Sequence, residues 1–235
     1  MKNQYAGDIG DYTKIGILKA IEKHFSLGIN WYLTPNDKRT DGKFTTAEYI
    51  KKPDIKPDKK LFDILKEISK KENRQVKYLE SNISWINTTF YSKNFQNPKE
   101  RDKWHKGAME KLAGKEIIFC DPDNGLEVKS IKPKSKNGNK YTTYQEVADY
   151  YKSGASVIVY NHRDRKPQEE YLKRFTKFKE IEETADAKMF YLRASKFSVR
   201  DYLFVVHEQH FPELEKVIDE FLNTEWHIYL TKYYF

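Results

Sequence analysis

The chain has 235 residues, of which 38% are hydrophobic and 15% aromatic, and its formal net charge is +8. A mainly disordered chain is excluded, because disorder requires few aromatic residues, and a positive charge favours polyanionic partners such as nucleic acid or nucleotides. No apolar stretch approaches the roughly 20 residues of a membrane-spanning helix, and the first residues lack the apolar region of a signal peptide. We therefore expect a cytoplasmic protein with no membrane partner. The single cysteine, Cys120, excludes an internal disulfide and a multi-cysteine zinc site.

The apolar patterns predict helices and strands that alternate along the chain. In chain order they predict a helix at residues 13–25, a strand at 28–34, a helix at 59–71, a strand at 76–80, an ambiguous stretch at 81–98 with a candidate strand at 88–91, and a helix at 98–112. There follow a strand at 116–120, a helix at 144–151, a strand at 155–160, a helix at 167–183, strands at 188–193 and 202–207, a helix at 211–222 and a strand at 226–233. Such alternation is typical of right-handed crossover units. We predict one α/β domain over residues 1–235, with a three-layer, Rossmann-like, mostly parallel sheet that has an antiparallel edge.

Polar residues follow several of the predicted strands. Glu80 closes one strand, the segment Asp-Pro-Asp-Asn-Gly at residues 121–125 follows a continuous apolar run, and His162 follows the next such run. In open α/β sheets, ligands bind beyond the carboxyl ends of the strands. We therefore expect these side chains to meet in one crevice.

The segment after the apolar run offers ligands for a hard cation. Asp121, Asp123 and Asn124 place several oxygen atoms close together in the sequence. Mg²⁺ takes one or two carboxylates together with phosphate oxygens, so a catalytic cation could bind here with Glu127 or Glu80 as a further ligand. The alternative is an ordinary Asp-Pro turn with an Asp cap. We favour a functional role, because the segment directly follows a buried strand.

Two basic segments are candidates for binding phosphate. His162, the usual type of general acid or base, is followed by Arg163 and Arg165, whose guanidinium groups match the geometry of phosphate. The alternative for this segment is a solvated loop between a strand and a helix. The second segment, at residues 129–140, is basic through Lys132, Lys134, Lys136 and Lys140. We expect both segments to attract nucleic-acid phosphates regardless of base sequence.

The opening of the chain places two carboxylates and a lysine near the start of the first predicted helix. These residues are Asp8, Asp11 and Lys14. A helix N-terminus binds anions through its backbone N–H groups, but two carboxylates would repel a phosphate. A ribose hydroxyl, a metal or a cationic group therefore fits the charges better. The alternative is a helix start that is simply capped by Asp11 or Thr13.

These segments together resemble a known family. A buried strand that ends in Asp121-Pro122, a helix, and a strand that ends in Tyr160 plus polar residues resemble the second half of Rossmann-like S-adenosylmethionine methyltransferases. The layout is similar to that of the ribosomal-RNA adenine N6-methyltransferases and the three-Cys-motif partner proteins, and the opening Gly-Asp-x-x-Asp-Tyr-x-Lys resembles their N-terminal segment. The resemblance implies an S-adenosylmethionine cofactor, bound by Asp8, Asp11 and Lys14 with Glu80 at its ribose.

Two features depart from that family. Its members follow the first strand with a glycine-rich turn, whereas residues 31–37 contain no glycine. Its adenine-specific members continue the Asp-Pro motif with Pro and an aromatic residue, whereas this chain has Asp123 and Asn124. A degenerate member of the family therefore stays among the hypotheses.

Three hypotheses of function follow. The leading one is an enzyme of methyltransferase-like fold that acts on nucleic acid or a nucleotide, with Asp121, Asp123, Asn124 and His162 as catalytic residues. The second is a metal-dependent nuclease or phosphodiesterase that binds Mg²⁺ through Asp121, Asp123 and Glu127. The third is a non-catalytic module that binds a nucleotide or a partner protein.

Overall fold

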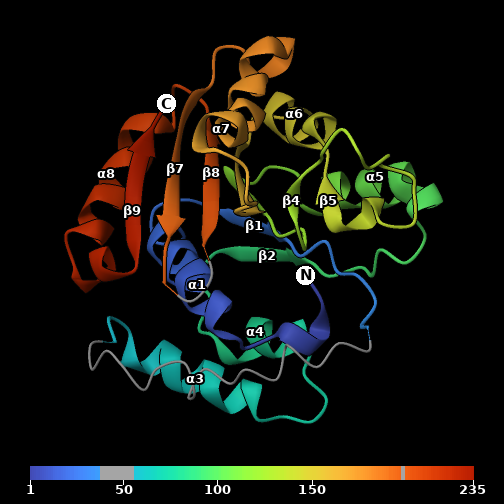
Figure 1. The fold of residues 1–235 in the computed structure, drawn as a ribbon. Helices are drawn as coiled ribbons and strands as arrows, with labels where there is room; N and C mark the ends of the chain where they lie inside the picture. The colour runs from blue at the N-terminus through green and yellow to red at the C-terminus, as the bar shows by residue number, and fades with distance from the viewer. Residues whose placement is uncertain (38–55, 197–198) are drawn as a thin grey trace.

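The computed structural model describes residues 1–37, 56–196 and 199–235, and its centre is a seven-stranded sheet with the strand order β2-β1-β3-β6-β8-β7-β9 (Figure 1). The strands of this sheet are β1 (Leu27–Asn30), β2 (Thr88–Tyr91), β3 (Ile117–Cys120), β6 (Ser156–His162), β7 (Lys188–Ala194), β8 (Arg200–Val206) and β9 (Leu230–Tyr234). A second, two-stranded sheet consists of β4 (Gly125–Leu126) and β5 (Tyr141–Thr142).

The large sheet is parallel on one side and antiparallel on the other. Strands β2, β1, β3 and β6 pair in parallel. Strand β8 runs antiparallel to both of its neighbours, β6 and β7, and β9 runs antiparallel to β7. Strand β7 consequently points in the same direction as the four parallel strands. The predicted mostly parallel sheet with an antiparallel edge is confirmed.

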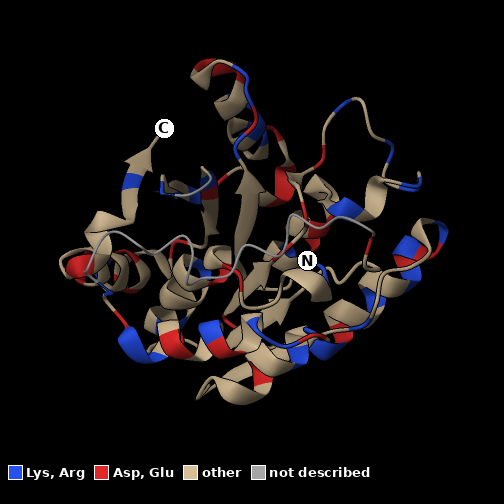
Figure 2. Cartoon of the chain, turned by 60° about the horizontal axis from the view of Figure 1, so that its bottom comes forward, with Lys and Arg blue, Asp and Glu red and all other residues tan. Residues whose placement is uncertain are grey.

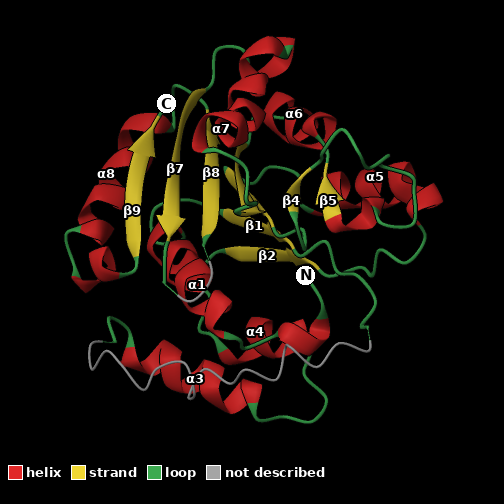
Figure 3. Ribbon diagram, in the orientation of Figure 1, coloured by secondary structure: helices red, strands yellow, loops and turns green. Residues whose placement is uncertain are grey.

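Helices cover both faces of the large sheet (Figure 3). One face is covered by α1 (Ile9–Ile21), α3 (Lys59–Ser69), α4 (Val76–Asn82) and α8 (Phe211–Leu222), and the other by α5 (Arg101–Lys111), α6 (Tyr144–Lys152) and α7 (Gln168–Thr176). Successive residues of β3 alternate between the two cores, with Phe119 in the first and Cys120 in the second. The fold is therefore a three-layer, Rossmann-like α/β fold, and Cys120, the last residue of β3, is a free, buried thiol.

Short 3₁₀ helices complete the described chain. They lie at Asn3–Tyr5, Pro98–Glu100, Gly138–Lys140, Lys177–Glu180, Glu182–Thr184 and Glu225–Ile228. Three of them, the last three in the chain, lie where the sequence predicts the end of a helix at 167–183 and the start of a strand at 226–233, because α7 ends at Thr176 and β9 begins only at Leu230. None of the helices in the described ranges is long and apolar enough to cross a membrane.

Two sequence predictions about local structure are wrong. Residues 76–80, predicted as a strand, belong to helix α4, whose Val76 and Leu79 are buried at helical spacing. Helix α1 begins at Ile9 rather than at residue 13, because the cap is the side chain of Asp8, which accepts a hydrogen bond from the amide of Gly10 at 2.7 Å. Asp11 therefore lies inside the first turn of the helix rather than at its cap.

Candidate functional site

The strand order locates the edge of the sheet where a ligand is expected. Strand β1 lies between β2 and β3. The chain therefore adds β2 on one side of β1 and later adds β3 on the other side, so the direction in which strands are added reverses at β1. Open α/β sheets bind ligands at such a reversal, beyond the carboxyl ends of the strands. The ends of β1 and β3 are joined there, since the amide of Asp121 donates to the carbonyl of Asn30 at 2.9 Å.

A buried ion triad joins helix α1 to this edge. The Nζ atom of Lys14 lies 2.9 Å from Oδ1 of Asp11 and 2.8 Å from Oδ2 of Asp121, and all three side chains are buried. Burial alone would lower the pKa of Lys14, but the two carboxylates outweigh it and raise that pKa well above its ordinary value. The lysine therefore stays charged. Three of the predicted residues are thus brought together.

Asp123 points into a second group of cations. Its Oδ1 lies 2.9 Å from the amino group of Met1, its Oδ2 lies 3.8 Å from Nζ of Lys2, and Oδ2 accepts a hydrogen bond from the hydroxyl of Thr34 at 3.0 Å. Burial raises the pKa of the Asp123 carboxyl, but the positive groups overcome this and hold the pKa below its ordinary value. Asp123 is therefore an ionised acceptor near neutral pH.

His162 lies at the end of β6, next to the Asp-Pro-Asp-Asn-Gly segment. Its amide donates to the carbonyl of Asn124 at 3.4 Å, and its Nε2 lies 3.2 Å from the hydroxyl of Tyr160. The side chain is open to solvent on one side, yet the surrounding protein atoms and the positive charge of Arg200 lower the pKa of the imidazole to about 4. The ring is consequently neutral at neutral pH, and it can accept a proton.

Arg200 and Asp8 complete this charged group from two further elements. Residue Arg200 begins β8 and pairs in register with His162, and its guanidinium group lies against Gly10, where an added Cβ would meet Nη1 at 2.4 Å. Burial and the nearby carboxylate of Asp11 raise the pKa of Asp8 to about 6. Two carboxylates, a guanidinium group and an imidazole therefore gather where α1 meets β6 and β8.

The sequence patterns missed Arg200 for a geometric reason. In the parallel strands, the carboxyl end reaches the ligand-binding edge. Because β8 is antiparallel to β6, its first residue reaches that edge instead. Only the direction of β8 identifies Arg200 as part of the site.

Tyr32, which follows β1, has an unusual backbone conformation for a residue other than glycine. Its φ is 45°, in the left-handed region that glycine usually occupies. The hydroxyl of Tyr32 lies 2.7 Å from Oγ1 of Thr142 and donates to a carboxylate oxygen of Glu146 at 3.1 Å, and its amide donates to the side chain of Asn30 at 3.1 Å. These bonds hold the unusual backbone conformation. Tyr32 therefore adopts the left-handed conformation at the place where the methyltransferase family has a glycine-rich turn.

Two predicted residues do not join this group. Glu80 lies on α4 and not at a strand end, and its carboxylate accepts hydrogen bonds from the indole of Trp31 at 2.9 Å and from the hydroxyl of Ser92. Glu127 accepts from the amide of Tyr144 at 2.9 Å, so it caps the start of α6. Within residues 1–37, 56–196 and 199–235, no group of three His, Cys, Asp or Glu side chains is placed to bind a metal ion. The structure therefore does not assemble the Mg²⁺ ligands predicted at Asp121, Asp123 and Glu127.

The predicted basic loop is attached to the core. Arg101 donates to the carbonyls of Gly138 at 2.9 Å and Pro133 at 3.3 Å, and it also pairs with the buried carboxylate of Glu146 at 2.6 Å. Among the four predicted lysines, Lys134 forms an ion pair with Asp102 at 2.6 Å, and the side chains open to solvent are those of Lys132, Lys134 and Lys136, while Lys140 is half-buried. Figure 2 shows basic and acidic segments interspersed over the helices, without one uniformly basic face in that view.

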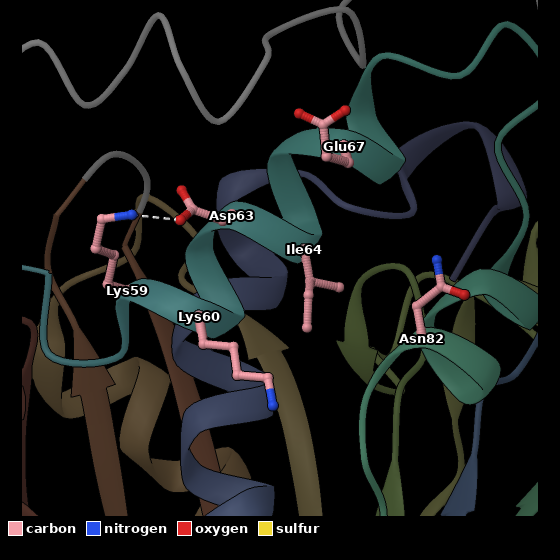
Figure 4. A pocket seen from close by; sticks show the side chains of 6 residues that line it. All are labelled: Lys59, Lys60, Asp63, Ile64, Glu67 and Asn82. Carbon is pink, nitrogen blue, oxygen red and sulfur yellow. Dashed lines mark hydrogen bonds and ion pairs between the residues drawn. The ribbon is translucent and has the colours of Figure 1, made fainter.

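Two cavities lie on other elements. One, of about 640 Å³, is lined by residues of α3 and by Asn82 at the end of α4 (Figure 4). The second, of about 800 Å³, lies between α5, α6 and the basic loop, and Arg101 and Glu146 are among its lining residues. Neither cavity is lined by Asp8, Asp121 or His162.

Comparisons with known proteins find no relative of this chain. No protein family matches the chain, and no curated protein or solved structure is significantly similar to it.

Proposed function

We propose that the protein is an enzyme of methyltransferase-like fold that acts on nucleic acid or a nucleotide and binds S-adenosylmethionine beyond the ends of β1, β3 and β6. One observation carries the proposal: side chains of α1, β3, β6 and β8 meet where the strand order reverses. The left-handed conformation of Tyr32 supports it further, because it lies after β1, where the methyltransferase family has its glycine-rich turn.

The charges favour a ligand that carries both signs. Arg200 is positive, and Asp8, whose pKa is about 6, is mostly negative at neutral pH, so these two side chains can hold the opposite charges of a zwitterionic amino-acid group. Asp8 is half-buried at the start of α1 and can accept a hydrogen bond from a ribose hydroxyl. Because Lys14 is already bound to Asp11 and Asp121, its part is to position α1 against β3. Glu80 has no part, since Trp31 and Ser92 occupy its carboxylate.

The reacting group of the substrate would lie beside Asp123, Asn124 and His162. S-adenosylmethionine, when bound, supplies a methyl group on a positively charged sulfur. Asp123 and Asn124 accept and donate hydrogen bonds that orient the attacking amino group. As the new carbon–nitrogen bond forms and the carbon–sulfur bond breaks, the neutral imidazole of His162 can take the proton that the nitrogen loses. The low pKa of His162 keeps its ring unprotonated before the reaction.

Calorimetry with S-adenosylmethionine and S-adenosylhomocysteine tests the cofactor part. We expect heat of binding for both and a rise in melting temperature, and we expect Asp8→Asn to weaken the binding. The matched control is Asp102→Asn, which removes an exposed carboxylate on α5 and should leave the affinity unchanged. Absence of both heat and melting shift for the wild-type protein would remove the cofactor from the proposal.

Transfer of a labelled methyl group to nucleic acid tests the reaction. Asp123→Asn and His162→Ala should each reduce transfer much more than they reduce cofactor affinity, because both residues face the substrate rather than the cofactor. If the wild-type protein binds cofactor and transfers nothing to RNA, DNA or nucleotides, the proposed reaction is wrong and a non-catalytic module is favoured.

A further inference from the structure

The guanidinium groups of Arg163 and Arg174 lie against the ring of Tyr171 on α7. Their central carbon atoms are 4.1 Å and 5.7 Å from the ring centroid. Both groups share the carboxylate of Asp164, at 3.7 Å from Nη1 of Arg163 and 3.4 Å from Nη1 of Arg174. The pair therefore carries two positive charges against one negative charge. Sequence patterns predicted a phosphate contact for Arg163 but did not find Arg174.

Each guanidinium group has a donor that is not used. Nη1 of Arg163 and Nε of Arg174 are buried and have no hydrogen-bond partner within the part of the chain that the structure describes. Their Nη2 atoms are used, since Arg163 donates to the carbonyl of Lys166 and Arg174 to that of Leu126. A buried donor without an acceptor is costly. The two side chains are each 15% exposed, so an anion with several acceptor oxygens that displaces the carboxylate of Asp164 can reach both guanidinium groups from solvent.

The position of Arg163 next to His162 favours a nucleic-acid strand over a free nucleotide as the source of the anion that binds Arg163 and Arg174. Successive side chains of an extended strand point to opposite faces. The ring of His162 contacts Tyr160 and faces the charges of α1 and β8, whereas Arg163 contacts Tyr171 of α7. A ligand that reaches both must pass around the end of β6. A free nucleotide carries its phosphate on its own sugar, whereas a nucleic-acid strand carries phosphates on both sides of each base.

We propose that Arg163 and Arg174 form a clamp for a phosphodiester group of a nucleic-acid strand. The clamped phosphodiester lies one nucleotide away from the nucleotide that reaches His162. The clamp rests on the proposed function, and it narrows the substrate from any nucleotide to a polynucleotide. Binding exchanges the long contacts to Asp164 for charge-assisted hydrogen bonds to phosphate. Arg174 contacts the carbonyl of Leu126, which precedes the basic loop at residues 129–140. The lysines of that loop would therefore extend the positive surface along which the nucleic-acid strand lies.

Fluorescence anisotropy with labelled single-stranded DNA and RNA, measured over a range of salt concentrations, tests the clamp. Arg163→Gln should weaken binding to every base sequence and reduce the slope of log affinity against log salt by about 0.7, the value for one phosphate contact of a single strand. Asp164→Asn should act in the opposite direction, because it frees both guanidinium groups. The matched control is Lys173→Gln on the same helix, whose exposed lysine is expected to leave the slope nearly unchanged.

A measurement on the wild-type protein tests the clamp even if the Arg163→Gln variant does not fold. Bound oligonucleotide should protect Arg163 and Arg174 from an arginine-specific reagent, as measured by mass spectrometry of the peptides with and without the oligonucleotide. A salt slope unchanged by Arg163→Gln, or equal modification with and without oligonucleotide, overturns the clamp. Mononucleotide phosphate that protects as well as an oligonucleotide overturns the assignment to a polynucleotide.

The two proposals fail in different ways. If S-adenosylmethionine binds Arg163→Gln normally and the oligonucleotide slope does not change, the clamp is wrong and the cofactor proposal stands. If the slope falls as expected but no cofactor binds the wild-type protein, the clamp stands and the proposed methyl transfer is wrong.

Discussion

The ammonium group of Lys14 lies 2.8 Å from a carboxylate oxygen of Asp121, and both side chains are buried. This contact connects helix α1 to the end of β3 across 107 residues of sequence. Removal of the lysine would leave Asp11 and Asp121 as two buried carboxylates without their shared cation. The stability of the fold and the geometry of the candidate site therefore depend on the same ion triad.

We expect Lys14→Met to lower the free energy of unfolding by about 3–5 kcal/mol, as is typical when one partner of a buried ion pair is removed. Urea unfolding at neutral pH measures the change. The control is Lys59→Met, since Lys59 pairs with Asp63 on the exposed side of α3, and no measurable loss is expected there. Equal losses for the two variants would show that the triad does not stabilise the fold.

Gly125→Ala should destabilise the protein more than Gly114→Ala. Both glycines have positive φ, 105° and 73°, so both replacements meet the left-handed penalty of about 1–2 kcal/mol. Only at Gly125 would the new Cβ also collide with Asn161, at 2.4 Å from Oδ1 and 2.8 Å from Cα, whereas Gly114 has open space. Thermal unfolding measures both variants, and similar melting temperatures would contradict the close approach of Gly125 and Asn161.

The raised pKa of Asp8 makes stability depend on pH with a definite sign. The carboxyl group has an ordinary pKa of 3.8 and a pKa of about 6 in the folded protein. The folded state therefore retains its proton longer than the unfolded state, and the contribution of Asp8 is lost as pH rises between these two values. The unfolding free energy of the wild type relative to Asp8→Asn should fall over that range. A difference that is constant or rises with pH would contradict the burial of Asp8.

NMR titration of His162 tests the electrostatics of the β6 end. The imidazole should be half-protonated near pH 4 instead of its ordinary 6.5. Because Arg200 lowers this pKa and Asp123 raises it, Arg200→Gln should move the midpoint upward and Asp123→Asn should move it downward. Shifts in the same direction for both variants would show that His162 does not lie between these charges.

Tyr32→Phe should cost about 1–3 kcal/mol of stability, because the buried groups that the hydroxyl contacts, Thr142 and Glu146, would lose a partner. The loss is measured by urea unfolding against Tyr233→Phe, in which an exposed tyrosine is changed in the same way. If both variants are as stable as the wild type, the hydroxyl is not what holds the turn after β1.

The sequence predicted the buried strands well because their apolar runs have a simple physical cause. Strands β3 and β6 are covered by helices on both faces, so β3 is apolar throughout and β6 is apolar over its central residues 157–160. The sequence predicts a strand where helix α4 lies because Val76, Lys77 and Tyr78 also fit an alternating apolar and polar pattern over so short a segment. That error carried Glu80 into the predicted site, although its carboxylate only holds Trp31 and Ser92.

The parts of the site that could not be predicted depend on direction and on backbone conformation. Asp11, Lys14 and Asp121 were found by their residue types and are brought together as an ion triad. Arg200 joins because β8 reverses direction, which residue periodicity does not encode. Tyr32 adopts a φ of 45° that nothing about a tyrosine in the sequence signals, since the hydrogen bonds that hold it come from residues distant in the chain.

The parallel half of the sheet also determines when the protein can fold during its synthesis. Strand β1 is made early, but its partners, β2 and β3, lie at residues 88–91 and 117–120. Closing such long loops is slow and entropically costly. The edge of β1 that pairs with β3 must therefore remain unpaired until about half of the chain has been synthesised, and during this period chaperones can bind the exposed apolar residues.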